Sequence, residues 1–257
     1  MSFDWRTATT SIDLSKQAAA VAVESAAKAT GGRDRILYEL VGKDDRRYSP
    51  YCWRVRMALA HKGMEAHFEP VKMIEKDKIA FSQQKLVPIM IDYGEVVTDS
   101  WDIAKYLEDN YYPERSLGLS GGTRFVNTWV DTQLQPALVR VLIGDLYGHV
   151  HPDDSEYFRL SREKRFGISI EEMHARREEY VIALTKVLAP LRETLRTRPF
   201  VSGKAPTYAD YIVFGAFQWA RCVSPYKLVD EEDPINLWRR RMVVLYGSLA
   251  NSVPHYE

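Results

Sequence analysis

The sequence has few cysteines, no excess of either charge and no long hydrophobic run. Its 257 residues include two cysteines, Cys52 and Cys222, which lie far apart in the chain. Two distant cysteines do not form a disulfide framework, so we expect a reducing compartment. Lys plus Arg and Asp plus Glu both number 35, which argues against general binding of nucleic acid or acidic membranes. Because no apolar run reaches the ~18 residues of a membrane span, the sequence predicts a soluble, cytoplasmic protein.

Residues 1–33 differ in composition from the rest of the chain. Residues 15–28 are rich in alanine, and Gly31 and Gly32 follow them. This pattern predicts a helical N-terminal extension that ends at the glycines. The extension is either exposed and loosely docked or packed on the body or on a second subunit. It lacks the apolar and basic character of a signal peptide, so secretion is not expected.

A compact α/β pattern is predicted over residues 34–112. Strand-like runs lie at 36–41, 66–71, 89–92 and 95–97, helix-like runs lie at 50–62 and 101–110, and a partly helical connection covers 73–84. Tyr93 and Gly94 between the last two strands indicate a hairpin. The order β-α-β-α-β-β-α is that of a thioredoxin-like domain.

The remainder of the chain is predicted to be an all-helical domain at 121–257, after a linker at 113–120. A helix from Thr123 to Tyr147 should be kinked at Pro136. A capping signature at residues 169–172 precedes a predicted long helix to about Leu195. Further helices are predicted at 211–221, where the sequence is apolar nearly all round, and at 234–249.

Ser49 and Pro50 stand where the first predicted strand gives way to the first predicted helix. Serine is a favoured N-cap residue, and proline fits the first helical turn because its missing N–H needs no partner there. The N-terminus of a helix stabilises anions and thiolates through its free N–H groups and its dipole. We therefore interpret Ser49 as a residue that holds another molecule's sulfur; the alternative is that it only caps its helix.

Four motifs, in this order, resemble those of glutathione transferases over about residues 35–250. They are Ser49-Pro50-Tyr51-Cys52, Val87-Pro88, Asp99-Ser100, and residues 200–203 followed by 206–210. The first is similar to the CPYC of glutaredoxins with serine in place of the first cysteine. Among subfamilies the chain looks most like the serine-type, etherase-related transferases, which include bacterial β-etherases, fungal etherase-like enzymes and the bacterial eta class.

The resemblance implies glutathione as co-substrate and no other cofactor; no metal site is expected from the residues themselves. It assigns Ser49 to the thiolate of glutathione, and it implies a cis Pro88 that lets Val87 present its backbone to the cysteinyl part. Asp99 and Ser100 would bind the γ-glutamyl end. The side chains suited to the glycyl carboxylate are Gln84 and Lys85, which are equally compatible with exposure to solvent.

Other residues near Ser49 offer competing chemistry. Tyr48 and Tyr51 carry hydroxyls, and tyrosine holds the thiolate in other transferase classes, but there it lies near the end of the first strand. Cys52 has no cysteine three residues upstream, so a mechanism that uses two thiols is excluded. We expect Cys52 to be a small buried side chain.

The resemblance places the acceptor site between the two domains. The aromatic and cationic candidates to line it are Tyr48, Trp53, Trp129, Tyr147, Trp219 and Arg221. Aromatic residues at helical spacing also form ordinary hydrophobic cores, and Arg221 also fits a surface salt bridge.

The sequence thus predicts a homodimeric enzyme that conjugates glutathione to hydrophobic, aromatic electrophiles. Two alternatives stay open: glutathione-dependent cleavage of β-aryl ethers, and binding of hydrophobic ligands without catalysis. The serine at position 49 argues against thiol–disulfide exchange.

Overall fold

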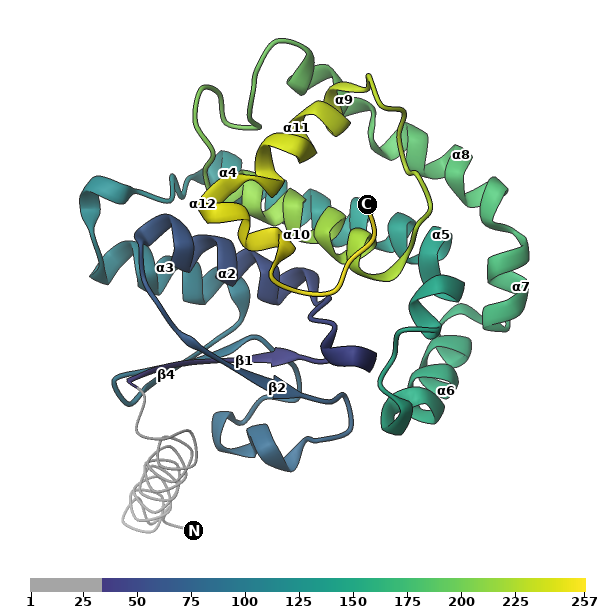
Figure 1. The fold of residues 1–257 in the computed structure, drawn as a ribbon, viewed down its shortest axis with the longest axis horizontal. Helices are drawn as coiled ribbons and strands as arrows, with labels where there is room; N and C mark the ends of the chain where they lie inside the picture. The colour runs from purple at the N-terminus through teal and green to yellow at the C-terminus, as the bar shows by residue number, and fades with distance from the viewer. Residues whose placement is uncertain (1–33) are drawn as a thin grey trace, which may run out of the picture.

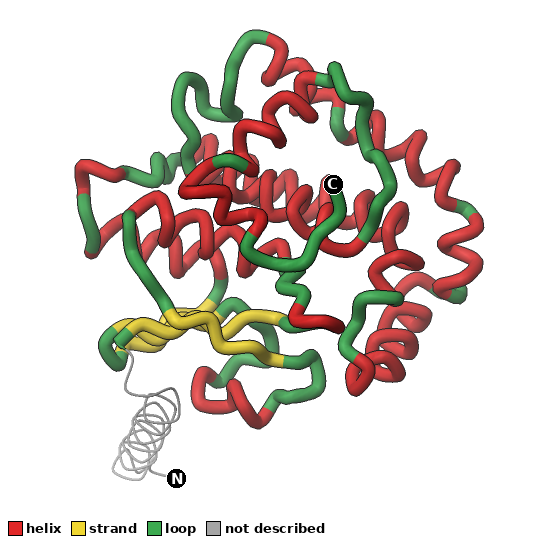
Figure 2. Tube along the Cα trace, viewed as in Figure 1, coloured by secondary structure: helices red, strands yellow, loops and turns green. Residues whose placement is uncertain are grey.

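A computed structural model describes residues 34–257, so the predicted N-terminal extension lies outside the described residues. Figure 1 shows a small sheet on one side, with α2 and α3 between it and a larger helical region. Figure 2 shows that all the strands gather in this one sheet. The predicted fold class, a thioredoxin-like domain followed by an all-helical domain, is confirmed.

The first half follows the predicted order with one difference. Its elements are β1 (Arg35–Leu40), α2 (Pro50–Lys62), β2 (His67–Val71), β3 (Ile89–Asp92), β4 (Glu95–Thr98) and α3 (Ser100–Asn110). The connection between β2 and β3 forms only a short 3-10 helix, Asp77–Ser82. The strand order is β2-β1-β3-β4, in which β1 and β2 are parallel and the other pairs are antiparallel.

The second half is helical throughout its regular elements. Its α-helices are α4 (Gly121–Trp129), α5 (Gln135–Tyr147), α6 (Ser155–Phe166), α7 (Ile170–Ala175), α8 (Arg177–Val187), α9 (Ala189–Arg196), α10 (Tyr208–Val223), α11 (Pro234–Val243) and α12 (Leu245–Ser248). None of the helices in the described part of the chain is long and apolar enough to cross a membrane.

Two of the predicted long helices are interrupted. The single helix expected from residue 170 to 195 is three helices, because the backbone leaves the helical region at Arg176 and Pro190 begins a new helix without an N–H to donate. The last predicted helix ends early because Tyr246 and Gly247 take positive φ angles of 53° and 67°. The kink expected at Pro136 is a π-helical segment, Val130–Leu134, directly before the proline.

Helix α10 is the centre of the molecule and packs on α2. All but one of its residues are buried, and its N-terminus has a complete capping box between Thr207 and Asp210. The buried Asp210 carboxylate also accepts hydrogen bonds from Val201 N–H and Trp238 Nε1–H, at 2.8 and 2.9 Å. This network fixes α10, which in turn supports the start of α2.

At Gly215, α10 approaches the backbone of α2 closely. A Cβ atom at this position would lie 2.4 Å from the carbonyl oxygen of Pro50. We expect Gly215→Ala to reduce the free energy of unfolding by about 1–3 kcal/mol, because the backbones must separate to admit the methyl group. Urea denaturation measures the change.

Gly122→Ala is the matched control, since its Cβ would meet only the Ser120 Oγ at 3.6 Å in a helix where alanine is favoured. Equal stability of the two variants would contradict the close approach.

Candidate functional site

Ser49 is the N-cap of α2 and faces a cavity. Its side-chain Oγ accepts a hydrogen bond from the Cys52 N–H at 3.3 Å, and Pro50 takes the first helical position. The residue is only 4% exposed but lines the cavity wall. The hydroxyl therefore sits at the positive end of a helix dipole, where a sulfur anion is stabilised.

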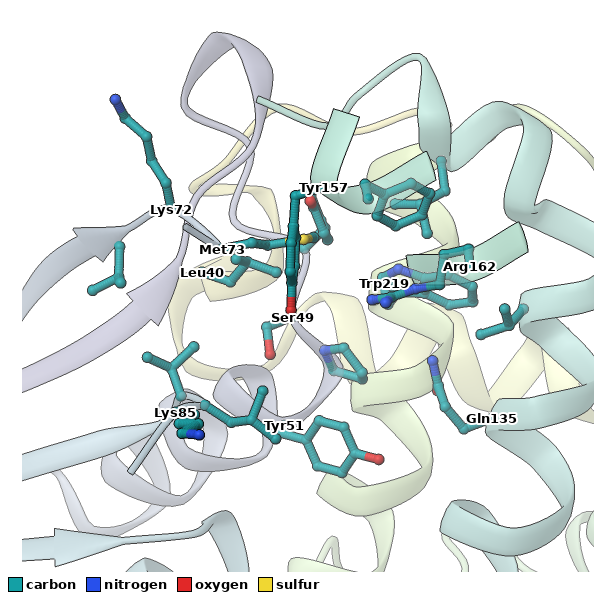
Figure 3. A pocket seen from close by; sticks show the side chains of 18 of the residues that line it. Leu40, Ser49, Tyr51, Lys72, Met73, Lys85, Gln135, Tyr157, Arg162 and Trp219 are labelled. Carbon is teal, nitrogen blue, oxygen red and sulfur yellow. The ribbon is translucent and has the colours of Figure 1, made fainter. Parts of the chain in front are cut away.

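The cavity has a volume of about 340 Å³ and is bounded by both halves of the molecule. In Figure 3, Ser49 lies near the centre, with Tyr51 and Gln135 below it and Arg162 to one side. Apolar side chains from β1, β2, the loop after β2, α5, α6 and α10 form much of the wall, among them Leu40, Val71, Met73, Val139, Phe158 and Trp219. A space of this kind suits a largely hydrophobic ligand held by a few polar groups.

Two polar atoms of the wall have no hydrogen-bond partner within the described chain. They are the hydroxyl of Tyr48 and the Oε1 of Gln135, and both are buried. Burial, and next the charge of Asp154, raises the pKa of Tyr48, so its hydroxyl keeps its proton at neutral pH. Buried polar atoms are normally satisfied, so these two atoms are available to form hydrogen bonds with a ligand.

Two loop segments have unusual backbone geometry, one at Val87–Pro88 and the other at Asp99, before α3. The Val87–Pro88 peptide bond is cis, as expected, and Val87 lines the cavity. Asp99 has a positive φ of 70° and caps α3, accepting from the Trp101 N–H at 2.7 Å. Burial, then the charge of Asp131 and, less strongly, that of Asp99 raise the pKa of the Tyr51 hydroxyl.

The residues singled out in the sequence fall into two groups. Those that line the cavity are Tyr48, Ser49, Tyr51, Lys85, Val87 and Trp219. Those that do not are Gln84, Pro88, Asp99, Ser100, Trp53, Trp129, Tyr147 and Arg221.

Three of the residues expected to line the acceptor site make their contacts elsewhere in the protein. Trp53 is buried and donates from Nε1 to the Arg47 carbonyl at 2.6 Å. Tyr147 stacks on Phe158 beside α6. Arg221 lies at a second cavity near the C-terminus and donates to the Ala250 carbonyl and the Asn251 side chain.

The sequence analysis missed the contribution of α6. Phe158, Arg162 and Arg165 line the cavity from this helix, together with Phe166. Their spacing of three and four residues places them on one face of a helix. The sequence shows this shared face but not what it meets, because that depends on how α6 folds onto the rest of the molecule.

The cysteine nearest to Ser49 is inert. Cys52 is 2% exposed, and burial, then the charge of Glu39, raises the pKa of its thiol to about 12. The thiol is therefore protonated at neutral pH and is a poor nucleophile. Within residues 34–257, no three His, Cys, Asp or Glu side chains are grouped as a metal site requires.

We expect Cys52→Ala to keep glutathione-conjugating activity within about twofold of wild type, a change typical of substitutions outside a site. Steady-state rates with an activated aryl halide measure this, and Cys222→Ala, at the other buried cysteine, is the matched control. Loss of activity in the Cys52 variant alone would instead favour thiol chemistry at this position.

Two domain families match the sequence. The glutathione S-transferase N-terminal domain matches residues 45–115, and the glutathione S-transferase C-terminal domain matches residues 123–234. Glutathione S-transferase Z1 of Arabidopsis thaliana is 36% identical over 69 residues, a match that covers 25% of this chain and 31% of the curated relative.

Solved structures of glutathione transferases share the fold of this chain. A glutathione transferase of Phanerochaete chrysosporium is 25% identical with a TM-score of 0.65, covering 84% of this chain and 93% of the other. A glutathione S-transferase of Ceriporiopsis subvermispora in complex with glutathione has a TM-score of 0.70 at 19% identity, covering 86% and 99%. With both domain families matched in order across most of its length, the chain belongs to the glutathione S-transferase family.

Proposed function

We propose that this protein is a serine-type transferase of the etherase-related group that conjugates glutathione to hydrophobic, aromatic electrophiles. The observation that carries the proposal is the position of Ser49 at the N-terminus of α2, in the wall of a 340 Å³ cavity bounded by both halves. In this reaction the thiolate attacks an electrophilic carbon, and the leaving group departs with its electron pair.

The hydroxyl of Ser49 supplies enough stabilisation to favour the thiolate. A free thiol has a pKa near ~8.5 and is mostly protonated at neutral pH. A hydrogen bond to a charged group is worth roughly 1.5–3 kcal/mol, and one pKa unit corresponds to ~1.4 kcal/mol, so the pKa falls by about one to two units. The dipole of α2 adds to this effect.

The rest of glutathione is assigned to the predicted thioredoxin-like domain, residues 34–112. Val87 makes no backbone hydrogen bond within the described chain, so its N–H and C=O are available to the cysteinyl unit. Ser100 and the N-terminus of α3 suit the γ-glutamyl carboxylate, and Asp99 suits its amine. Gln84 and Lys85 are exposed and lie shortly before Val87 in the chain, where they suit the glycyl carboxylate.

The predicted helical domain, residues 121–257 after the 113–120 linker, supplies the acceptor side of the cavity. Its contributions include Val139 from α5, Phe158 from α6 and Trp219 from α10. We further propose a cytoplasmic homodimer, as the family resemblance implies. Sedimentation at several protein concentrations tests the dimer.

Conjugation is tested with glutathione and an activated aryl halide such as a chlorodinitrobenzene. Turnover above the uncatalysed rate supports the proposal; no turnover together with retained binding of hydrophobic ligands would favour a binding protein. An aryl-ether model compound separates the enzymatic alternative, because release of the phenol shows that the ether oxygen leaves.

A further inference from the structure

The cavity beside Ser49 carries much more positive than negative charge. Five cationic side chains line it, Lys72, Lys76, Lys85, Arg162 and Arg165, against the single carboxylate of Asp131. That carboxylate is already engaged, since it accepts from the guanidinium of Arg54 at 2.6 Å. An apolar cavity with this charge attracts anions more strongly than neutral molecules.

Several of these cations have partners inside the protein. Lys72 pairs with Asp153 at 2.6 Å, and the ammonium of Lys76 donates to the Lys85 carbonyl at 2.7 Å. Lys85 and Val87 are both assigned to glutathione under the proposed function. This leaves Arg162 and Arg165, which lie on α6 in the other half of the molecule.

Arg162 is a half-buried cation without a carboxylate partner. It forms no ion pair within residues 34–257; its Nη1 donates to the Ser161 Oγ at 3.0 Å and its guanidinium stands 4.8 Å from the centre of the Phe158 ring. Burial, then the charge of Arg165, lowers its pKa. A desolvated cation left unpaired is unfavourable, and an anionic ligand removes that cost.

The unpaired hydroxyl of Tyr48 belongs to the same part of the cavity. The charge of Arg162 acts on Tyr48, and Figure 3 shows Arg162 directed toward the space around Ser49. The Tyr48 hydroxyl keeps its proton at neutral pH, because its pKa is raised, and this buried O–H has no acceptor within the described chain. A guanidinium and a hydroxyl donor together suit a carboxylate.

We propose that the acceptor substrate is an aromatic electrophile that carries a carboxylate, and that Arg162 pairs with this carboxylate beside the hydroxyl of Tyr48. The inference rests on the proposed conjugation and names its substrate class. Arg162 is thus a specificity-determining residue, and Ser49 remains the residue that holds the sulfur.

The test compares a chlorodinitrobenzoate with its methyl ester. In both, the sulfur of glutathione bonds to the ring carbon that carries chlorine, the carbon–chlorine bond breaks, and chloride leaves with the electron pair. Each kcat/KM is divided by the uncatalysed rate constant with glutathione, which removes the difference in intrinsic reactivity. We expect wild type to favour the carboxylate.

Arg162→Met should lower kcat/KM for the carboxylate by about 10- to 100-fold, the size of a lost charge-assisted hydrogen bond. The ester should change by about twofold or less. Arg162→Lys keeps the charge and should restore part of the carboxylate activity. The matched control is Lys164→Met, an exposed cation of α6 that does not line the cavity.

The outcomes separate the two proposals. If wild type conjugates neither compound, the proposed function fails. If it conjugates both and Arg162→Met affects them equally, the carboxylate-bearing substrate is overturned. A rise in KM for glutathione alone would also overturn it, because Arg162 would then bind a carboxylate of glutathione.

Discussion

Ser49→Ala is expected to reduce kcat for conjugation by about 10- to 100-fold at neutral pH, the equivalent of one hydrogen bond to a charged group. The hydroxyl stabilises the thiolate and not the thiol, so its removal raises the pKa of bound glutathione by about one to two units. The rate loss therefore has its full size below the wild-type pKa and disappears as the pH rises past the higher pKa of the variant. The ultraviolet absorbance of the thiolate, titrated in the binary complex, measures the shift directly.

Ser49→Thr is the matched control, because it keeps a hydroxyl and an N-cap of α2. The alanine variant also loses the hydrogen bond from the Cys52 N–H, which costs about 1 kcal/mol of stability. Thermal unfolding of both variants separates this effect from the chemistry. An alanine variant that is folded and as active as wild type, with an unchanged thiolate pKa, would remove Ser49 from the mechanism.

Local signals in the sequence predicted the helix that begins after Ser49. Helix α2 runs from Pro50 to Lys62 as predicted, because a serine cap, a proline in the first turn and Gly63 in the left-handed region define its ends without help from the rest of the fold. The cis bond before Pro88 has a different source, because it was expected only from the resemblance to glutathione transferases.

What depended on packing between distant segments was harder to predict. Trp53 was expected near the acceptor, but its indole nitrogen is turned to the Arg47 carbonyl and its ring lies in the core. Arg162 reaches the cavity only because the chain after α5 folds back and places α6 across the cavity from the start of α2. No local pattern in the sequence reports that approach.

A buried ionic cluster joins the elements around Ser49. Glu39 on β1 is 1% exposed and accepts from Arg56 Nε on α2 at 2.7 Å. It also accepts from Arg47 Nη1 at 2.7 Å, two residues before Ser49. One carboxylate therefore holds the strand, the loop and the helix in a fixed relation, and it is shared by two guanidinium groups, of which that of Arg47 also pairs with Asp45.

Glu39→Gln is accordingly expected to cost about 3–5 kcal/mol of unfolding free energy, since a buried ion pair that loses one partner leaves the other charge uncompensated. Urea denaturation measures the loss, and Glu65→Gln, an exposed carboxylate, should change stability by less than about 0.5 kcal/mol. The double variant Glu39→Met with Arg56→Met should be more stable than Glu39→Gln, because it also removes the Arg56 guanidinium, which would otherwise be buried without its carboxylate partner. Equal stability of Glu39→Gln and wild type would show that the cluster does not hold the Ser49 loop in place.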